Sequence, residues 1–228
     1  NRMLGKIVDQ VYISIPGSEG FFPKGKTVLT GNPVRAELLD AAGQQKDQAA
    51  SKTVLVLGGS QGAHRVNSLM VEAFASGFSG DAIQVRHQTG NSDEEWVRKA
   101  YAAAGVTAQV SSFISDMAAA YREADLVVSR AGATTLAELA ILGKPAILIP
   151  FPYAADDHQT TNAVFLARGG AALMFQEQDL DGAKLRGKIL GLMNDAPRLQ
   201  GMAAKMKQFA RPEATVAIVE KSIQLLAA

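Results

Sequence analysis

The chain has 228 residues, of which 47% are hydrophobic and 20% are charged, and this composition is typical of a soluble globular protein. It contains no cysteine, which excludes disulfides, thiolate metal ligands and a cysteine nucleophile. Because 23 Lys and Arg residues nearly balance 22 Asp and Glu residues, the net charge predicts neither a nucleic acid nor an anionic membrane as a partner.

Residues 1–52 contain few regular patterns. The chain begins at Asn1 without an initiator methionine and without a signal-peptide pattern, so we expect its natural start to lie further upstream. Residues 8–15 are typical of a strand, but the Gly- and Pro-rich residues that follow offer it no partner strand. We therefore expect this strand to belong to a preceding domain, and residues 40–52 to form an exposed helix end or loop.

From residue 53 onward, short β-branched segments alternate with longer helical segments. The predicted strands are residues 53–57, 83–88, 107–111, 125–129, 145–150 and 171–175. We expect Ser92 and Ser115 to cap two of the intervening helices, and Gly143 to end a third. Only helices are predicted after the last strand, over about residues 180–193, 197–209 and 212–226. The pattern predicts an α/β fold, a Rossmann-like doubly wound parallel sheet with a C-terminal helical tail.

A glycine-rich loop, with the sequence Gly-Gly-Ser-Gln-Gly-Ala, follows the first of these strands at residues 58–63. Its glycines allow a ligand close to the backbone, and the next helix directs free N–H groups at an anion. No Gly-Lys-Ser/Thr follows, as a Walker loop requires, and the glycine spacing differs from that of dinucleotide-binding loops. An NAD-dependent oxidoreductase is therefore disfavoured, and a purely structural turn stays open as an alternative.

Two further strand ends carry small or polar residues. Residues 129–135 lead into a helix that contains Glu138, and a Pro-rich exit after the next strand leads into a polar helix start at residues 156–162. Acids and polar side chains at helix starts are common for capping alone. However, the carboxyl ends of parallel strands meet at one edge of the sheet, where ligands bind. The three loops together therefore predict one binding site.

These segments resemble the C-terminal half of the MurG family of peptidoglycan N-acetylglucosaminyltransferases, which have the GT-B fold. The resemblance is carried by the glycine-rich loop and by the segments at residues 113–117, 130–138 and 157–163, and it covers nearly the whole chain in the family's order. It implies that residues 1–34 are a remnant strand of the acceptor domain plus an interdomain linker. It also implies that residues 35–228 form a UDP-GlcNAc-binding domain with terminal helices.

The resemblance assigns roles to individual residues. The implied donor-binding residues are Arg35, Ser60, Gln61, Gly62, Phe113, Ile114, Ala133, Thr134, Thr135, Glu138, His158 and Gln159. The glycine-rich loop, Arg35 and the helix start at residues 133–135 would hold the diphosphate. Backbone groups near Ile114 would recognise uracil and Glu138 the ribose. His158 and Gln159 would contact the sugar, although the family often has Gln where His158 stands.

The resemblance also implies an inverting transfer of GlcNAc to a lipid-linked muramyl-pentapeptide acceptor. The catalytic base and the acceptor site would lie in the upstream domain, so the isolated chain is expected to be inactive. The full-length enzyme would be cytoplasmic and peripheral on the inner face of the plasma membrane. We expect no cofactor, no metal and no nucleic acid. Asp179 and Asp181 match a metal-binding D-x-D pattern, but helix capping explains them better.

Two other interpretations stay open. A UDP-GlcNAc 2-epimerase would share the fold but would need its own carboxylates and histidine in the cleft. A nucleotide-binding module without chemistry is the alternative from another class. The remaining histidines favour no enzyme in particular, because His64 is expected on a helix surface and His87 is expected to be structural.

Overall fold

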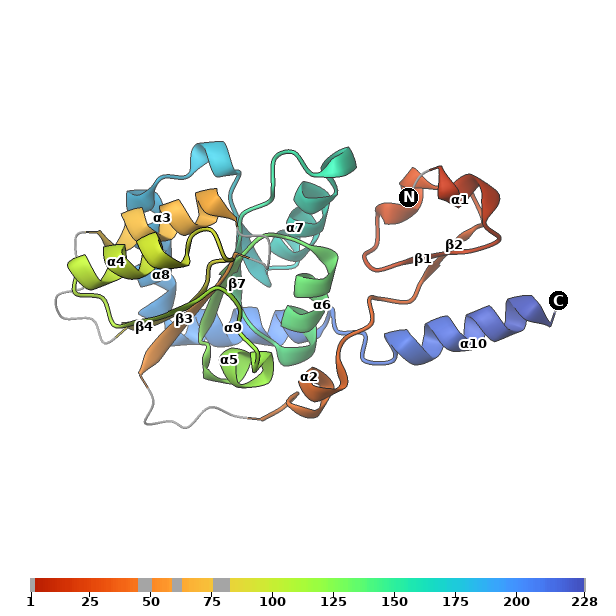
Figure 1. Cartoon of the computed structure of the whole chain (residues 1–228). Helices are drawn as coiled ribbons and strands as arrows, with labels where there is room; N and C mark the ends of the chain where they lie inside the picture. The colour runs from red at the N-terminus through yellow and green to blue at the C-terminus, as the bar shows by residue number, and fades with distance from the viewer. Residues whose placement is uncertain (1–2, 45–50, 59–62, 76–82, 228) are drawn as a thin grey trace.

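The computed structural model of the chain describes residues 3–44, 51–58, 63–75 and 83–227. Its main body is a six-stranded parallel sheet in the order β5-β4-β3-β6-β7-β8, which confirms the predicted doubly wound α/β fold (Figure 1). The strands are β3 (Lys52–Leu57), β4 (Ile83–Gln88), β5 (Ala108–Ser111), β6 (Leu126–Ser129), β7 (Ala146–Leu148) and β8 (Ala172–Met174).

The central strand β3 shows why both faces of the sheet are covered by helices. Val54 and Val56 point into one buried hydrophobic cluster, whereas Leu55 and Leu57 point into another on the opposite face. Successive side chains of a strand point to opposite faces, so an uninterrupted apolar strand must be buried on both sides.

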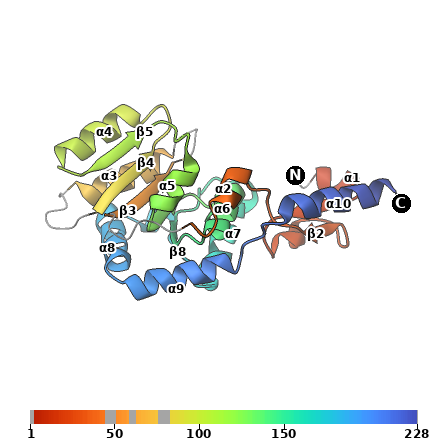
Figure 2. The same cartoon turned by 90° about the horizontal axis from the view of Figure 1, so that it is seen from below.

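The helices divide between the two faces. The first cluster is covered by α3 (His64–Phe74), α4 (Glu94–Ala103) and α8 (Gly182–Met193). The second is covered by α2 (Ala36–Asp40), α5 (Met117–Glu123), α6 (Ala133–Leu142) and α7 (His158–Arg168). Helix α9 (Ala196–Lys207) packs against both α8 and α6, and so crosses below the sheet from one side to the other (Figure 2). Three short 3₁₀ turns, η1 (Ser18–Phe21), η2 (Ala155–Asp157) and η3 (Glu177–Asp179), complete the connections.

The N-terminal segment departs from the prediction of a strand without a partner. Strand β1 (Val11–Ile13) pairs in parallel with β2 (Thr27–Leu29), next to the short helix α1 (Leu4–Ile7). The sequence prediction was wrong because β2 has only three residues and is soon followed by Gly31-Asn32-Pro33, so its strand pattern is weak. The last helix, α10 (Ala214–Leu226), leaves the main body and lies beside this segment, where Tyr12 Oη and Ser222 Oγ are 3.0 Å apart (Figure 1).

The two predicted serine caps were also wrong, because an aspartate one position further on occupies each cap. Asp93 is the N-cap residue of α4, and its carboxylate lies buried among polar side chains. Asp116 caps α5 by accepting a hydrogen bond of 2.9 Å from Ala119 N–H. The interpretation of Asp181 as a cap is confirmed, since its carboxylate accepts from Lys184 N–H at 2.7 Å.

Gly143 ends α6 as predicted, in the left-handed conformation that favours glycine. Within the described ranges, no helix combines the length and the apolar character needed to cross a bilayer.

Candidate functional site

The candidate site lies where the strand order of the sheet reverses, between β3 and β6. Leu57 at the end of β3 pairs with Ser129 at the end of β6, so both strands end at the same edge of the sheet. Ligands of open α/β sheets bind at such a point. Of the predicted residues, Ser60, Gln61 and Gly62 lie outside the described residues. Ala133 and His158 line one hollow, and Phe113 and Ile114 line another.

Gly58 begins the glycine-rich loop and has no room for a side chain. A Cβ atom there would lie 2.9 Å from Asn67 Oδ1 and 2.9 Å from the Gln88 carbonyl oxygen. Gly58 N–H donates to that same carbonyl at 2.8 Å. This contact ties the start of the loop to the end of the neighbouring strand β4.

A buried polar network lies next to Gly58. Asn67 donates to Thr89 O at 2.9 Å and to Asp93 Oδ2 at 2.8 Å, so its Oδ1 atom must face His87 Nε2 at 2.9 Å. His87 therefore carries its proton on Nε2, and its Nδ1 accepts from Tyr101 Oη at 3.0 Å. Burial lowers the pKa of His87 from 6.5 to about 3, against the opposing effect of Asp93. The prediction of a structural role for His87 is confirmed.

His64, the first residue of α3, is largely exposed, as the sequence predicted. Its Nδ1 atom lies 3.0 Å from Asp93 Oδ2, so the histidine joins the exposed edge of the same network. The network thus extends from the core of the sheet to the surface beside the glycine-rich loop.

Glu138 lies in the second turn of α6 and is almost fully buried. Its Oε2 atom accepts a hydrogen bond of 2.8 Å from Tyr121 Oη, and its Oε1 atom lies 3.5 Å from Nη2 of Arg35. Tyr121 is fully buried on α5, and Arg35 precedes α2 at the end of the linker. Sequence analysis did not identify Tyr121, because no local pattern connects residues on two different helices.

The start of α6 lies next to the linker. Asn32 Nδ2 donates to Thr134 Oγ1 at 3.3 Å, a contact that sequence analysis also missed. The first intrahelical hydrogen bond of α6 is donated by Leu136 N–H, so the N–H groups of Ala133, Thr134 and Thr135 have no acceptor within the helix. They form a concentration of donors at the positive end of the helix dipole.

Gln159, on the first turn of α7, holds two strand-end loops together. Its Oε1 atom accepts from Ala131 N–H at 3.2 Å and from Phe151 N–H at 3.0 Å. Nearby, Asn162 donates to Ala131 O at 3.1 Å. The carbonyl oxygen of Gln159 is thus engaged with the backbone, and its amide N–H₂ group is the part left for a ligand.

His158 begins α7 after an unusual turn. Asp156 and Asp157 both have positive φ values, of 55° and 51°, which side-chain-bearing residues rarely adopt. His158 Nδ1 lies 2.6 Å from Ala155 O. Because a carbonyl oxygen only accepts, Nδ1 carries a proton in this contact, and Nε2 makes no hydrogen bond with the described residues.

His158 and Ala133 line one side of an open hollow, and the N-terminal segment lines its other side. Its volume is about 380 Å³, within the range of about 300–1,000 Å³ typical of small-molecule sites. Tyr12, Ser14 and Phe22 line the opposite wall. The hollow therefore lies between the two parts of the chain that the linker connects.

Phe113 and Ile114 follow strand β5 beside the same edge of the sheet. Phe113 is 61% exposed, whereas Ile114 is buried and donates its N–H to Gln88 Oε1 at 3.1 Å. The Ile114 N–H group is thus engaged, and its carbonyl oxygen is the backbone group left to recognise a base. Gln88 is a third residue that sequence analysis missed, because its contact is with a different strand end.

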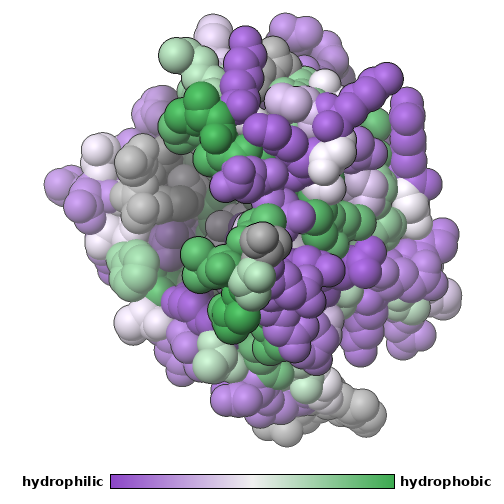
Figure 3. Space-filling model, turned by 90° about the vertical axis from the view of Figure 1, so that its right-hand side faces the viewer, coloured by the Kyte–Doolittle hydropathy of each residue, from purple (hydrophilic) through white to green (hydrophobic). Residues whose placement is uncertain are grey.

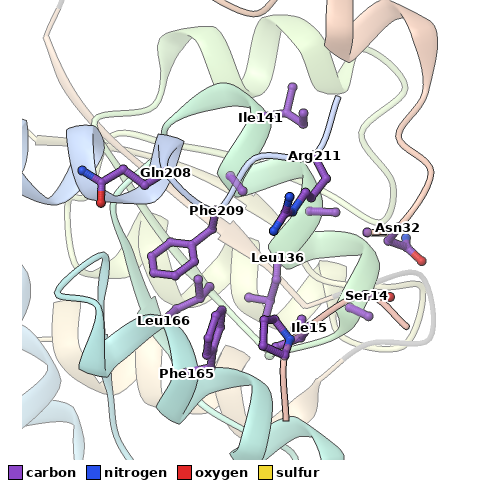
Figure 4. Close-up of a pocket in the computed structure, with 15 residues that line it drawn as sticks. Ser14, Ile15, Asn32, Leu136, Ile141, Phe165, Leu166, Gln208, Phe209 and Arg211 are labelled. Atoms are coloured by element: carbon purple, nitrogen blue, oxygen red, sulfur yellow. The ribbon is translucent and has the colours of Figure 1, made fainter. Parts of the chain in front are cut away.

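The linker packs against residues 208–211, where the chain passes a second time between the main body and the N-terminal segment. Gly31 has a φ of 87°, and a Cβ atom there would lie 2.5 Å from Arg211 Cβ. Next to this contact is a small, mainly apolar hollow between α6 and α7 (Figure 4). There the rings of Phe165 and Phe209 pack edge to face, with their centroids 5.0 Å apart. The two crossings join the main body to the N-terminal segment and α10.

Comparison with known proteins gives a consistent picture. The model of the family described as "Glycosyltransferase family 28 C-terminal domain" matches residues 53–218. A relative from Geobacter sp. (strain M21) is 50% identical over 223 residues, which are 96% of this chain and 60% of the relative. It is named UDP-N-acetylglucosamine--N-acetylmuramyl-(pentapeptide) pyrophosphoryl-undecaprenol N-acetylglucosamine transferase. The chain thus spans about three-fifths of the length of this relative.

Two solved structures are similar. The crystal structure of Acinetobacter baumannii MurG has 36% sequence identity and a TM-score of 0.78, over 96% of this chain and 61% of that one. A UDP-GlcNAc 2-epimerase from Neisseria meningitidis, bound to UDP-GlcNAc, has 14% identity and a TM-score of 0.65, over 98% of this chain and 63% of that one. At so low an identity, the epimerase shows likeness of fold alone.

Proposed function

Because this chain belongs to glycosyltransferase family 28 through its C-terminal domain, we propose that it is the donor-binding half of an inverting N-acetylglucosaminyltransferase of peptidoglycan synthesis. The donor is UDP-GlcNAc, and the acceptor is the lipid-linked muramyl-pentapeptide. The name of the 50% identical relative supports this reaction. The structural observation that carries the proposal is Glu138, a carboxylate oriented by Tyr121 beside the free N–H groups of α6.

The diphosphate binds at the start of α6. The N–H groups of residues 133–135 and the Thr134 hydroxyl donate to it, with Arg35 supplying a positive charge from the linker. The proposal also assigns Ser60, Gln61 and Gly62 to this subsite. When UDP leaves, negative charge grows on the diphosphate, and fixed dipoles and a guanidinium stabilise that charge without reorganisation.

Uridine binds along the same edge of the sheet. Glu138 accepts from the ribose hydroxyls through Oε1, since Tyr121 already occupies Oε2. The free Ile114 carbonyl accepts from the imide N–H of uracil, and exposed Phe113 lies beside the base. A base without a donor at that position, such as adenine, lacks this hydrogen bond.

The sugar of the donor occupies the hollow beside the starts of α6 and α7. There the free Nε2 atom of His158 accepts from a sugar hydroxyl, and the amide N–H₂ group of Gln159, the next residue along α7, donates to another. With the donor bound in this way, the anomeric carbon would lie between the diphosphate and the N-terminal segment. The acceptor hydroxyl would then attack from the side of that segment, opposite the leaving diphosphate.

The base that deprotonates the acceptor belongs to an upstream domain, of which residues 1–34 are the last part. Exposed apolar side chains support this division. They gather on the face formed by the N-terminal segment and α10, where Figure 3 shows apolar patches between polar residues, and they include Met3, Leu4, Ile7, Val219, Ile223 and Leu226.

In the full-length enzyme, we place the reaction at the cytoplasmic face of the plasma membrane, where the lipid-linked acceptor lies.

The test is calorimetry of this chain with UDP-GlcNAc, UDP-GalNAc, ADP and NADH, repeated with Glu138→Ala. A charged hydrogen bond is worth about 1.5–3 kcal/mol, so the substitution is expected to weaken UDP binding about ten- to a hundredfold. Release of free UDP with epimerised sugar would favour the epimerase alternative. Equal affinity of the wild-type chain for UDP-GlcNAc and NADH would contradict the proposal.

A further inference from the structure

We propose that Arg35 makes this site selective for phosphorylated uridine ligands, because its guanidinium covers the ribose-binding oxygen of Glu138 until a diphosphate draws it away. The inference rests on the proposed function, in which Glu138 binds the ribose. It adds a competition between a residue of the linker and the ligand for one carboxylate oxygen.

Arg35 and a ribose hydroxyl would have to use the same oxygen of Glu138. Oε2 is held from the interior by Tyr121 at 2.8 Å, and Oε1 faces Arg35 Nη2 at 3.5 Å. The Glu138 side chain is 10% exposed and that of Arg35 is 46% exposed. The guanidinium therefore covers the outward-facing oxygen, and a ribose hydroxyl must replace it to reach Glu138.

The ion pair is easy to break. Its N–O separation of 3.5 Å is longer than the roughly 2.7–2.9 Å of a strong charged hydrogen bond. The same guanidinium is shared with Glu37, whose Oε1 lies 3.5 Å from Nη1. A partly exposed, shared pair of this kind holds its partner weakly, so a better anion can take the arginine away.

The diphosphate subsite lies within reach of that arginine. Thr134 precedes Glu138 by four residues on α6, which corresponds to about 6 Å along a helix axis. Arg35 enters from the linker, three residues after Asn32, whose side chain already contacts Thr134. A rotation of the long arginine side chain is thus enough to move its charge from Glu138 to the phosphates.

The consequence is that Arg35 has opposite effects on two classes of ligand. A nucleoside must compete with the guanidinium for Glu138 and offers it no new partner. A nucleoside diphosphate offers a stronger partner a short distance away, and so releases Oε1 while gaining an ion pair. Removing the arginine should therefore improve binding of uridine and weaken binding of UDP.

The experiment measures binding of uridine and of UDP to the wild-type chain and to Arg35→Ala, by NMR titration and calorimetry. We expect uridine to bind about two- to fivefold more tightly to the variant, the gain that corresponds to losing a weak ion pair. We expect UDP to bind about ten- to a hundredfold more weakly. In a Glu138→Gln background, Arg35→Ala should no longer improve uridine binding, because the competing charge is absent.

Arg122→Ala is the matched control, since this arginine lies on α5 and contacts only Gln44 through its guanidinium among the described residues. It should leave both affinities unchanged. If Arg35→Ala weakens or leaves unchanged the binding of uridine while UDP still binds the wild-type chain, the competition is refuted but the donor site stands. If the wild-type chain binds neither ligand, the proposed function itself fails.

Discussion

Tyr121 and Glu138 form a hydrogen bond of 2.8 Å between the middle of α5 and the second turn of α6. Burial, followed by the charge of Glu138 and this hydrogen bond, raises the pKa of the Tyr121 phenol well above its usual range. The phenol therefore remains a donor at every working pH, and it fixes one oxygen of the carboxylate. The relationship turns a flexible side chain into an oriented acceptor at the edge of the sheet.

Tyr121→Phe removes this donor and keeps the ring. We expect the variant to lose about 1 kcal/mol of stability and to bind UDP about fivefold more weakly, because the carboxylate is no longer held in place. The informative quantity is the ratio of affinities for UDP and 2′-deoxy-UDP, which should decrease in the variant. An unchanged ratio with reduced stability would leave Tyr121 a purely structural residue.

We propose that recognition of uracil depends on the Gln88 side chain, which accepts a hydrogen bond from Ile114 N–H. We expect the wild-type chain to bind UDP more tightly than ADP or GDP. Gln88→Leu should reduce that preference several-fold, since the segment that carries the carbonyl loses its anchor. Calorimetry with the three nucleotides measures the effect, and equal affinity of the wild-type chain for all three would show that the base is not recognised here.

Stability should fall between pH 7 and pH 5 because of His87. The unfolded chain binds a proton at this residue below its ordinary pKa of 6.5, whereas burial in the folded chain lowers the pKa to about 3. The unfolded state thus binds more protons as the pH decreases, and folding weakens by about 2 kcal/mol over this interval. Urea unfolding at both pH values tests this.

His87→Gln is the matched variant, because glutamine can still donate to Asn67 but does not titrate. It is expected to be less stable than the wild-type chain at pH 7 and to depend less on pH. If the variant and the wild-type chain lost the same stability between pH 7 and pH 5, His87 would not be the source of the dependence.

The close contact of Gly31 with Arg211 makes the linker sensitive to a single methyl group. Gly31→Ala requires a positive φ in a residue with a side chain and brings Cβ to 2.5 Å from Arg211 Cβ. We expect a loss of about 1–3 kcal/mol in chemical denaturation. Gly20→Ala is the control, since nothing lies within 4 Å of a Cβ atom there, and equal effects of the two substitutions would rule out the contact as the cause.

The alternation of apolar strands and helices was enough to predict the sheet, because β3, β6 and β7 each form a nearly continuous buried segment. The alternation did not reveal β2, because three residues are too few to show a pattern. The caps were assigned to Ser92 and Ser115 instead of Asp93 and Asp116, because serine and aspartate are both good N-cap residues. The candidate site could be placed at one edge of the sheet because parallel strands end together.

The individual contacts within the site could not be predicted in this way. The contact of Glu138 with Tyr121 joins two helices, and that of Gln88 with Ile114 joins two strand ends, so only the packing of helices and strands sets their distances. The Arg35–Glu138 pair depends in addition on the path of the linker. Sequence patterns therefore indicated the type of site, whereas the partners of each side chain required the structure.

We propose that this chain binds the donor and that the residues that activate the acceptor lie in an upstream domain. The measurement that tests it most directly is an assay of residues 1–228 with radiolabelled UDP-GlcNAc and lipid-linked muramyl-pentapeptide, in parallel with a full-length relative. We expect saturable binding of UDP-GlcNAc and no transfer by the chain, and turnover by the full-length enzyme. Transfer by the chain at a rate near that of the full-length enzyme would contradict the claim and would make His158, whose Nε2 atom is free, the first candidate for the base.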